Sequence, residues 1–323
     1  MLTVARLRLP SIEWAAISAA ACLSAVFAVS VALVGFDTLT ANLSKLDSFT
    51  LGICLLLVAW QLGCRFLRWF FYARRLGLKV SLPEAFLYYG AGLGMTLTPA
   101  RLGEVLRLWF LEQRFAAPYR RTAGLYLADR VSDAVGYLIL FAVGSTAYTT
   151  GASITWGALL LVVTVVLAVM HPRPVFALLN AGYAVFGLGR RLVPWLRRAI
   201  RNASTLFQPA LFLPGVCIGT IGWLGPPAVL TLSLTQMGVE FGLLKACAIY
   251  AVAALTGGST MMPGGVGGTE AALTGLLLAS DVSLDTAVSA VVITRAAFLL
   301  LPVGLGLLLL PVAMRVVGKA GRG

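Results

Sequence analysis

The sequence predicts an all-α polytopic membrane protein with about six spanning helices and two oppositely oriented re-entrant helical hairpins that form an inverted repeat. The chain of 323 residues is 59% hydrophobic and only 11% charged, whereas soluble domains carry about a quarter charged residues. Several apolar runs reach the roughly 20 residues that a bilayer-spanning helix needs. Glycine, proline and charged residues nevertheless interrupt two otherwise apolar segments, at residues 95–104 and 261–270. Such breaks are tolerated at membrane depth where they line a polar cavity.

Composition also limits the domain organisation and the partners. No polar segment is long enough to fold separately, so we predict a single transmembrane domain over residues 1–323. The formal net charge is +13, but the arginines flank apolar runs as the positive-inside rule describes, and we expect no nucleic-acid partner. The five cysteines show no metal-ligand spacing, and His171 is the single histidine. We therefore expect neither a metal nor a cofactor.

The first two apolar runs are predicted to span the membrane. Residues 14–34 follow Arg6 and Arg8; this run is too long for a typical signal-peptide core and lacks a clear cleavage site, so we expect a spanning helix with a cytosolic N-terminus. The loop 36–49 suits the outside. The second span covers about residues 50–72. Basic residues lie in its last part and directly after it, and they indicate the cytosol: Arg65, Arg68, Arg74, Arg75 and Lys79.

The stretch 83–113 decides the predicted topology. It is apolar enough to enter the membrane, yet Arg114, Arg120 and Arg121 follow it. A full crossing over 83–98 would place these arginines outside or require a second crossing over 99–113, which is too short at roughly 15 residues. We therefore predict a re-entrant hairpin that enters and leaves on the cytosolic side. Residues 122–148 then span outward and 154–170 span back.

The second half is predicted to mirror the first. Residues 207–235 span outward, and 241–280 form another hairpin. The acidic residues Glu240, Asp281 and Asp285 flank this hairpin, so we expect it to open to the outside. Residues 286–310 span inward to a cytosolic C-terminus. The two predicted repeats, about 50–148 and about 207–310, face opposite sides, and inverted repeats with broken helices are typical of transporters.

The segment 171–206 between the repeats mixes six arginines with aromatic and aliphatic residues. This composition favours a basic amphipathic cytosolic segment lying on an anionic lipid surface. A plain solvated loop is the alternative.

Eight charged residues fall inside the predicted membrane region. They are Arg101, Glu104, Arg107, Asp129, Arg130, Asp133, Glu270 and Arg295. A lone charge there costs about 2.5–3.5 kcal/mol or more, so we expect Glu104 to pair with Arg130 and Glu270 with Arg295. Asp129 and Asp133 share one helical face, with Arg130 turned about 100° away. Alternatively, these charges are only buried ion pairs that fix helix register.

The backbone beside these charges favours a binding site for an anion. Thr98 and Pro99 have the pattern of an N-cap followed by proline at the first helical position. Glycines in the matching second segment leave backbone amides approachable, and helix N-termini together with arginines bind anions. At bilayer depth, the simplest candidate for the bound anion is the head group of a phospholipid or a polyprenyl phosphate. The candidate substrate-binding residues are Thr98, Pro99, Arg101, Glu104, Arg107, Asp129, Arg130, Asp133, Pro263, Gly264, Gly265, Gly267, Gly268, Glu270 and Arg295.

Three spaced motifs resemble boxes of the lysylphosphatidylglycerol-synthase transmembrane-region family, also called the flippase-like domain family. Residues 98–107, TPARLGEVLR, resemble its TPGRxGE box; 129–133, DRVSD, resemble its ERxxD box; and 262–272, MPGGVGGTEAA, resemble its PGGxGxxEaa box. Arg295 falls where the family has its late arginine. Ala100 replaces a common glycine, which tightens the allowed backbone, and Asp129 replaces a commoner glutamate, which shortens the reach of the acid. The resemblance covers about residues 51–310.

The resemblance implies a role in moving or presenting a polar or glycosylated lipid across a bacterial inner membrane. The basic residues near each end of the sequence predict that both termini are cytoplasmic. Relatives that make aminoacylated lipids carry this module fused to a soluble catalytic domain, which this sequence lacks, so we do not carry the synthase activity over. Some relatives accompany terpenoid-lipid or glycolipid pathways.

Three hypotheses follow for the function. The first is a lipid transporter or flippase for an anionic or glycosylated lipid, in which arginines meet the head group. The second is a membrane-embedded transferase that modifies a lipid acceptor, with Glu104 or Asp133 as general base; we find neither a phosphate loop nor a metal cluster for its donor. The third is a non-transporting scaffold. Expected partners are a membrane lipid, an anionic lipid surface, and a second copy of the chain or membrane proteins of a lipid pathway.

Overall fold

The computed structural model describes residues 12–98, 102–117, 119–148, 151–171, 205–260 and 262–320. Within these ranges every regular element is helical. The predicted basic amphipathic segment lies outside the described residues except at its two ends, and so do Pro99 and Arg101.

Several helices are long and apolar enough to cross a bilayer. Among the described residues these candidate spans are Ser48–Arg75, Ser153–Met170, Pro209–Gln236 and Leu284–Gly318. The first is α3 (Ser48–Arg75), and the second lies within α7 (Gly151–Met170). The third joins α10 (Pro209–Gly222) to α11 (Gly225–Gln236), and the fourth joins α14 (Leu284–Arg295) through η3 (Ala296–Leu300) to α15 (Leu301–Ala320). These spans support a multi-pass membrane protein, with fewer apolar spans than the predicted six.

Two predicted spans account for the difference. Helix α6 (Tyr119–Ser145) has the length to cross but carries charged side chains in its middle. Helix α1 (Ile12–Val34) is followed by α2 (Phe36–Leu43) after a bend of 104°, and together they would make a fifth span. Gly35 has a φ of 82° at this bend, a backbone conformation that glycine adopts without a steric cost.

The segment predicted as the external loop 36–49 is therefore partly helical. On α2 the Asn42 amide donates a hydrogen bond to the Ser289 hydroxyl of α14 (3.1 Å), and the Lys45 amine donates to Asn42 Oδ1 (2.9 Å). The prediction of a plain loop was wrong because this contact, between residues far apart in the chain, stabilises a short helix.

Side-chain caps set where α3 and α4 (Leu82–Leu93) begin. The Thr50 amide donates to Asp47 Oδ1 (2.8 Å), and hydrogen bonds from Thr50 hold the pKa of the Asp47 carboxyl below its ordinary value. Ser81 and Glu84 form a capping box at the start of α4, which satisfies two backbone donors at once. Arg114 also pairs with Glu84 (3.0 Å), and this ion pair joins α4 to α5 (Leu102–Phe115).

Each segment predicted as a hairpin contains a pair of short helices separated by a break. Helices α4 and α5 form the first, and α12 (Leu243–Ser259) and α13 (Gly268–Leu278) form the second. Glycine allows close packing within each pair: a Cβ atom at Gly103 would overlap the carbonyl oxygen of Gly92, and one at Gly257 would overlap the Thr269 hydroxyl. The break in the second hairpin contains the short 3-10 helix η2 (Pro263–Gly265) and three glycines with positive φ: Gly264, Gly265 and Gly267.

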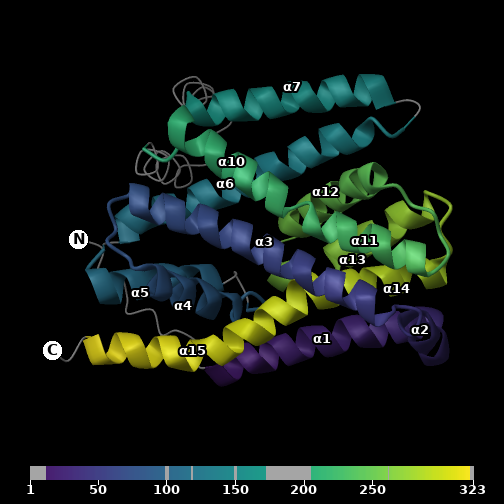
Figure 1. Ribbon diagram of the computed structural model, residues 1–323, viewed down its shortest axis with the longest axis horizontal. Coiled ribbons are helices and arrows are strands. Elements are labelled where there is room, and N and C mark those ends of the chain that lie inside the picture. Colours follow the sequence, from purple (N-terminus) through teal and green to yellow (C-terminus); the bar gives the residue numbers. More distant parts are fainter. Residues whose placement is uncertain are drawn as a thin grey trace, which may run out of the picture.

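Each hairpin packs against a long helix from the other half of the chain. Helix α6, which follows the first hairpin, packs against α12 of the second, whereas α15, near the end of the second half, packs against α4 of the first. Helix α3, which precedes the first hairpin, packs against α10 and α11, which precede the second. In Figure 1, α4 and α5 lie toward the end of the molecule where α15 finishes, and α12 and α13 lie toward the opposite end.

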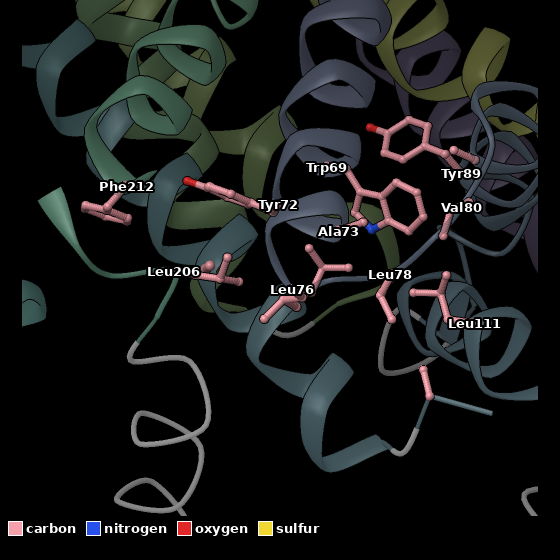
Figure 2. Packing of buried hydrophobic residues seen from close by; sticks show 14 of the residues in the cluster. Trp69, Tyr72, Ala73, Leu76, Leu78, Val80, Tyr89, Leu111, Leu206 and Phe212 are labelled. Atoms are coloured by element: carbon pink, nitrogen blue, oxygen red, sulfur yellow. The ribbon is translucent and has the colours of Figure 1, made fainter. Parts of the chain in front are cut away.

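The largest hydrophobic cluster packs around α3. Figure 2 shows Trp69 and Tyr72 of α3 between Tyr89 of α4 on one side and Phe212 of α10 on the other. The rings of Trp69 and Tyr89 are 5.8 Å apart. Because both halves contribute to this cluster, α3 and the arginines on it are held at the boundary between the halves.

Replacing Gly306 with valine should separate α15 from α4. A Cβ atom at Gly306 would overlap the backbone nitrogen of Gly94, and overpacking of this kind costs about 1–3 kcal/mol or more. We expect a lower unfolding temperature for Gly306→Val, measured by size-exclusion chromatography of heated detergent-solubilised protein. Gly304→Val on the same helix is the matched control, because its Cβ would meet no atom within 4 Å. Equal unfolding temperatures for the two variants would contradict the close helix contact.

Candidate functional site

A hollow of about 120 Å³ lies between the two hairpin breaks and the central helices. Four arginines line it from four different helices: Arg65, Arg107, Arg130 and Arg295. Thr96, from the first break, and the glycines of η2 complete the polar wall. A water molecule needs about 10–15 Å³ of this kind of volume, so the hollow accommodates several waters or a compact polar group.

Arg68 binds two aspartates behind this hollow. Its side chain is fully buried. Its Nε donates to Asp129 Oδ1 (2.8 Å), and its Nη2 donates to Asp133 Oδ1 (2.6 Å). The indole nitrogen of Trp223, between α10 and α11, also donates to Asp133 Oδ1 (2.7 Å). This network therefore ties α3, α6 and the α10–α11 break together.

Arg65 and Arg68 were interpreted as markers of the cytosolic end of the second span, but their side chains face the interior of the protein; the side of the membrane stays a prediction. The helix continues to Arg75, so both residues lie at least seven residues inside it. Their spacing of three places them on one face of the helix, toward the aspartates of α6. Sequence alone does not separate this case from arginines that extend along a helix to reach the membrane surface.

Arg130 contacts the same two aspartates. Its Nη2 lies 3.0 Å from Asp129 Oδ2 and 3.0 Å from Asp133 Oδ2. Position 130 is turned about 100° from the aspartate face of the helix, but the long arginine side chain reaches back across the helix surface to both carboxylates. The side chain of Glu104 lies outside the described atoms, so its pairing with Arg130 stays a prediction.

Arg65 and Arg107 contact aromatic rings at the hollow. The guanidinium carbon of Arg65 lies 4.8 Å from the centre of the Trp223 ring, and that of Arg107 lies 3.9 Å from the centre of the Tyr89 ring. The Nη2 atom of Arg65 is also 3.8 Å from Asp133 Oδ2. Cation–π contacts of this kind hold each guanidinium in place beside its ring.

The predicted pair between Glu270 and Arg295 is present. Arg295 Nε donates to Glu270 Oε1 (2.6 Å), and its Nη2 donates to the carbonyl oxygen of Gly264 (2.9 Å). One guanidinium therefore joins the start of α13, the end of α14 and the glycine turn. The second oxygen of Glu270, Oε2, is buried without a hydrogen-bond partner among the described atoms.

The candidate residues divide into groups around the hollow. Arg107, Arg130, Gly264, Gly265 and Arg295 line it, while Asp129 and Asp133 lie behind it. Glu270 and Gly267 line adjoining apolar pockets. Thr98, Pro263 and Gly268 belong to the breaks without lining the hollow; the Thr98 hydroxyl donates to the Met95 carbonyl (2.6 Å). Its expected capping role concerns residues 99–101, which lie outside the described residues.

Sequence reasoning missed several residues that line the hollow. They are Arg65, Thr96, Tyr137, Trp223 and Tyr250. Arg65 carries a signal in the sequence, since a second arginine follows it three residues later within one apolar helix. The aromatic residues carry none, because tyrosine and tryptophan in a membrane protein are most often found at the membrane–water interfaces.

Comparison with known families identifies one match over most of the chain. The sequence profile described as "Lysylphosphatidylglycerol synthase TM region" matches residues 14–306. The matched region includes both hairpins, the hollow and all eight charged residues identified in the sequence. No curated protein matches the chain.

Removing Arg68 should destabilise the protein strongly. Arg68→Met leaves two buried carboxylates that share fewer cations, and breaking a buried pair in this way costs about 3–5 kcal/mol. We expect a large fall in the unfolding temperature in detergent. Arg114→Met is the control, because its pair with Glu84 is 40% exposed on the arginine side and such pairs contribute at most about 1 kcal/mol. Similar unfolding temperatures would show that the Arg68 network does not support the fold.

Proposed function

Because this chain belongs to the lysylphosphatidylglycerol synthase TM region family, a group of membrane modules linked to lipid flipping and lipid synthesis, we propose that it is a lipid flippase. Its substrate is an anionic or glycosylated lipid of the bacterial inner membrane: a phospholipid, a polyprenyl phosphate or a terpenoid lipid. The observation that carries this proposal is the convergence of four arginines, contributed by both halves of the chain, on one hollow between the hairpin breaks.

The charge balance of the hollow favours an anionic head group. Five described arginines lie in or directly behind it: Arg65, Arg68, Arg107, Arg130 and Arg295. Three described carboxylates face them: Asp129, Asp133 and Glu270. Uncompensated positive charge is costly at membrane depth, and a phosphate accepts charge-assisted hydrogen bonds from several guanidiniums at once. A lipid phosphate is therefore a chemically suitable ligand for this group of guanidiniums.

The helix lengths support the re-entrant interpretation of both hairpins. Helices α4 and α5 have 12 and 14 residues, and α12 and α13 have 17 and 11. Each falls short of the roughly 20 residues needed for a crossing. In this proposal each hairpin enters and leaves on one side, the first from the cytosol and the second from outside. The exchanged packing of α6 with α12 and of α15 with α4 supports an inverted repeat.

This arrangement suggests how the hollow opens to each side in turn. In transporters with inverted repeats, one repeat moves against the other around a fixed central site. Arg295 is bonded both to Glu270 and to the Gly264 carbonyl. A phosphate that takes hydrogen bonds from Arg295 would compete with both acceptors and loosen the glycine turn. Head-group binding would thereby favour movement of the second hairpin.

Arginines of the hollow should be required for transport. We expect Arg130→Gln and Arg295→Gln to lower the rate of lipid exchange between leaflets of reconstituted vesicles by about tenfold to 100-fold, since a charged hydrogen bond contributes about 1.5–3 kcal/mol. Arg315→Gln is the control, because Arg315 is exposed on α15. The measurement follows quenching of a head-group-labelled phosphatidylglycerol that has reached the outer leaflet.

The same vesicles test the rival hypotheses. Unchanged exchange in both arginine variants would overturn the flippase assignment. A new lipid product formed from a nucleotide-sugar or aminoacyl donor would favour a transferase. Outside the vesicle assay, full cellular activity of the charge-swapped double variant Glu270→Arg with Arg295→Glu would favour a scaffold, because that change preserves the ion pair while it reverses the charge presented to a head group.

A further inference from the structure

An apolar groove of about 540 Å³ lies beside the polar hollow. Helix α1 forms one wall through Val26, Val29 and Leu33, and α13 and α14 form the other. Small residues on α13 create the space, and a Cβ atom at Gly275 would meet no atom within 4 Å. In Figure 1, α1 and α14 lie on the side of the molecule opposite α7.

A small pocket of about 70 Å³ shares lining residues with both the groove and the hollow. Arg295 and Leu299 line both this pocket and the hollow. Val26, Val266 and Glu270 line both this pocket and the groove. The Glu270–Arg295 ion pair therefore lies at the junction between a basic hollow and a hydrocarbon-like groove.

The length of the groove matches one leaflet of a bilayer. On α13 its lining runs from Glu270 to Leu278, a rise of about 12 Å along an α-helix. Half of the hydrocarbon core of a bilayer is about 15 Å thick. A single acyl chain, which spans one leaflet, therefore fits this length, and a much longer polyprenyl chain would extend beyond it.

We propose that this groove binds one acyl chain of an anionic phospholipid whose phosphate lies at the Glu270–Arg295 junction. The inference rests on the proposed function and adds to it the substrate class and the place where the lipid leaves the bilayer laterally. It also assigns a role to α1, which precedes both predicted repeats: α1 supplies the second wall of the groove. A bulk lipid that merely fills the surface would show no dependence on the arginines of the hollow.

Photo-crosslinking tests the groove directly. The probe is phosphatidylglycerol with a diazirine in the middle of one acyl chain, at low content in phosphatidylcholine vesicles that contain the full-length protein. We expect labelling of α1 between residues 24 and 34 and of α13, identified by mass spectrometry of peptides. A phosphatidylcholine probe with the same diazirine should label these segments much less. Arg65→Gln, which lowers the positive charge of the hollow, should reduce the preference for the anionic probe.

Filling the groove should remove this labelling. Gly275→Leu places a side chain in open space, so the protein should fold while the probe is excluded. Gly157→Leu is the matched control, since a Cβ at Gly157 on α7 would also meet no atom within 4 Å and Gly157 does not line the groove. Loss of labelling and slower lipid exchange in Gly275→Leu alone would support the proposal.

The remaining outcomes separate this inference from the proposed function. Equal labelling by both probes, or unchanged labelling in Gly275→Leu, would overturn the groove inference; slower exchange in Arg295→Gln would then still support the flippase. Stronger labelling by a diazirine-bearing polyprenyl phosphate would overturn the assignment to an acyl chain. Wild-type exchange in Arg295→Gln would overturn the proposed function, while anionic-selective labelling that Gly275→Leu removes would still support the groove as a lipid-binding site.

Discussion

A guanidinium is costly to place in the hydrocarbon interior of a membrane, so a buried arginine needs partners such as a carboxylate, a carbonyl or an aromatic ring within the protein. Arg68 meets this constraint with both Asp129 and Asp133. Because the three residues belong to α3 and α6, and Trp223 joins them from the α10–α11 break, this single network fixes the centre of the molecule. The hairpins, the hollow and the contacts between the halves are arranged around it.

The two hairpins are built in the same way but from different side chains. Each places a break in the helix near the arginines, and each is packed tightly through glycine. In the second hairpin, Arg295 joins Glu270 to the carbonyl of Gly264, so the conformation of the turn depends on the ion pair. A ligand that changes the partners of Arg295 therefore changes the hairpin itself, and this coupling is the physical basis of the proposed transport cycle.

The position of the ion pair also connects two environments. Arg295 faces the basic hollow, and Glu270 faces the apolar groove beside α1. An amphipathic ligand needs both environments at once, since its phosphate requires guanidiniums and its hydrocarbon chain requires apolar walls. Neither a water-soluble anion nor a neutral hydrocarbon would use the whole of this surface. The proposed lipid would use both parts.

The sequence by itself determined the membrane class, the family motifs, the two helix breaks and the Glu270–Arg295 pair, because hydropathy, proline and glycine act locally and a charge in an apolar segment demands a nearby partner. Only the tertiary structure decided that Arg68 is buried against Asp129 and Asp133, that Arg65 lines the hollow, and that residues 36–43 form a helix packed on α14. An arginine near the end of a span is compatible with both a surface position and a buried one. Which position the arginine takes depends on the helix that packs opposite it. For Arg68 this is the helix that carries Asp129, a residue more than 60 positions away in the chain.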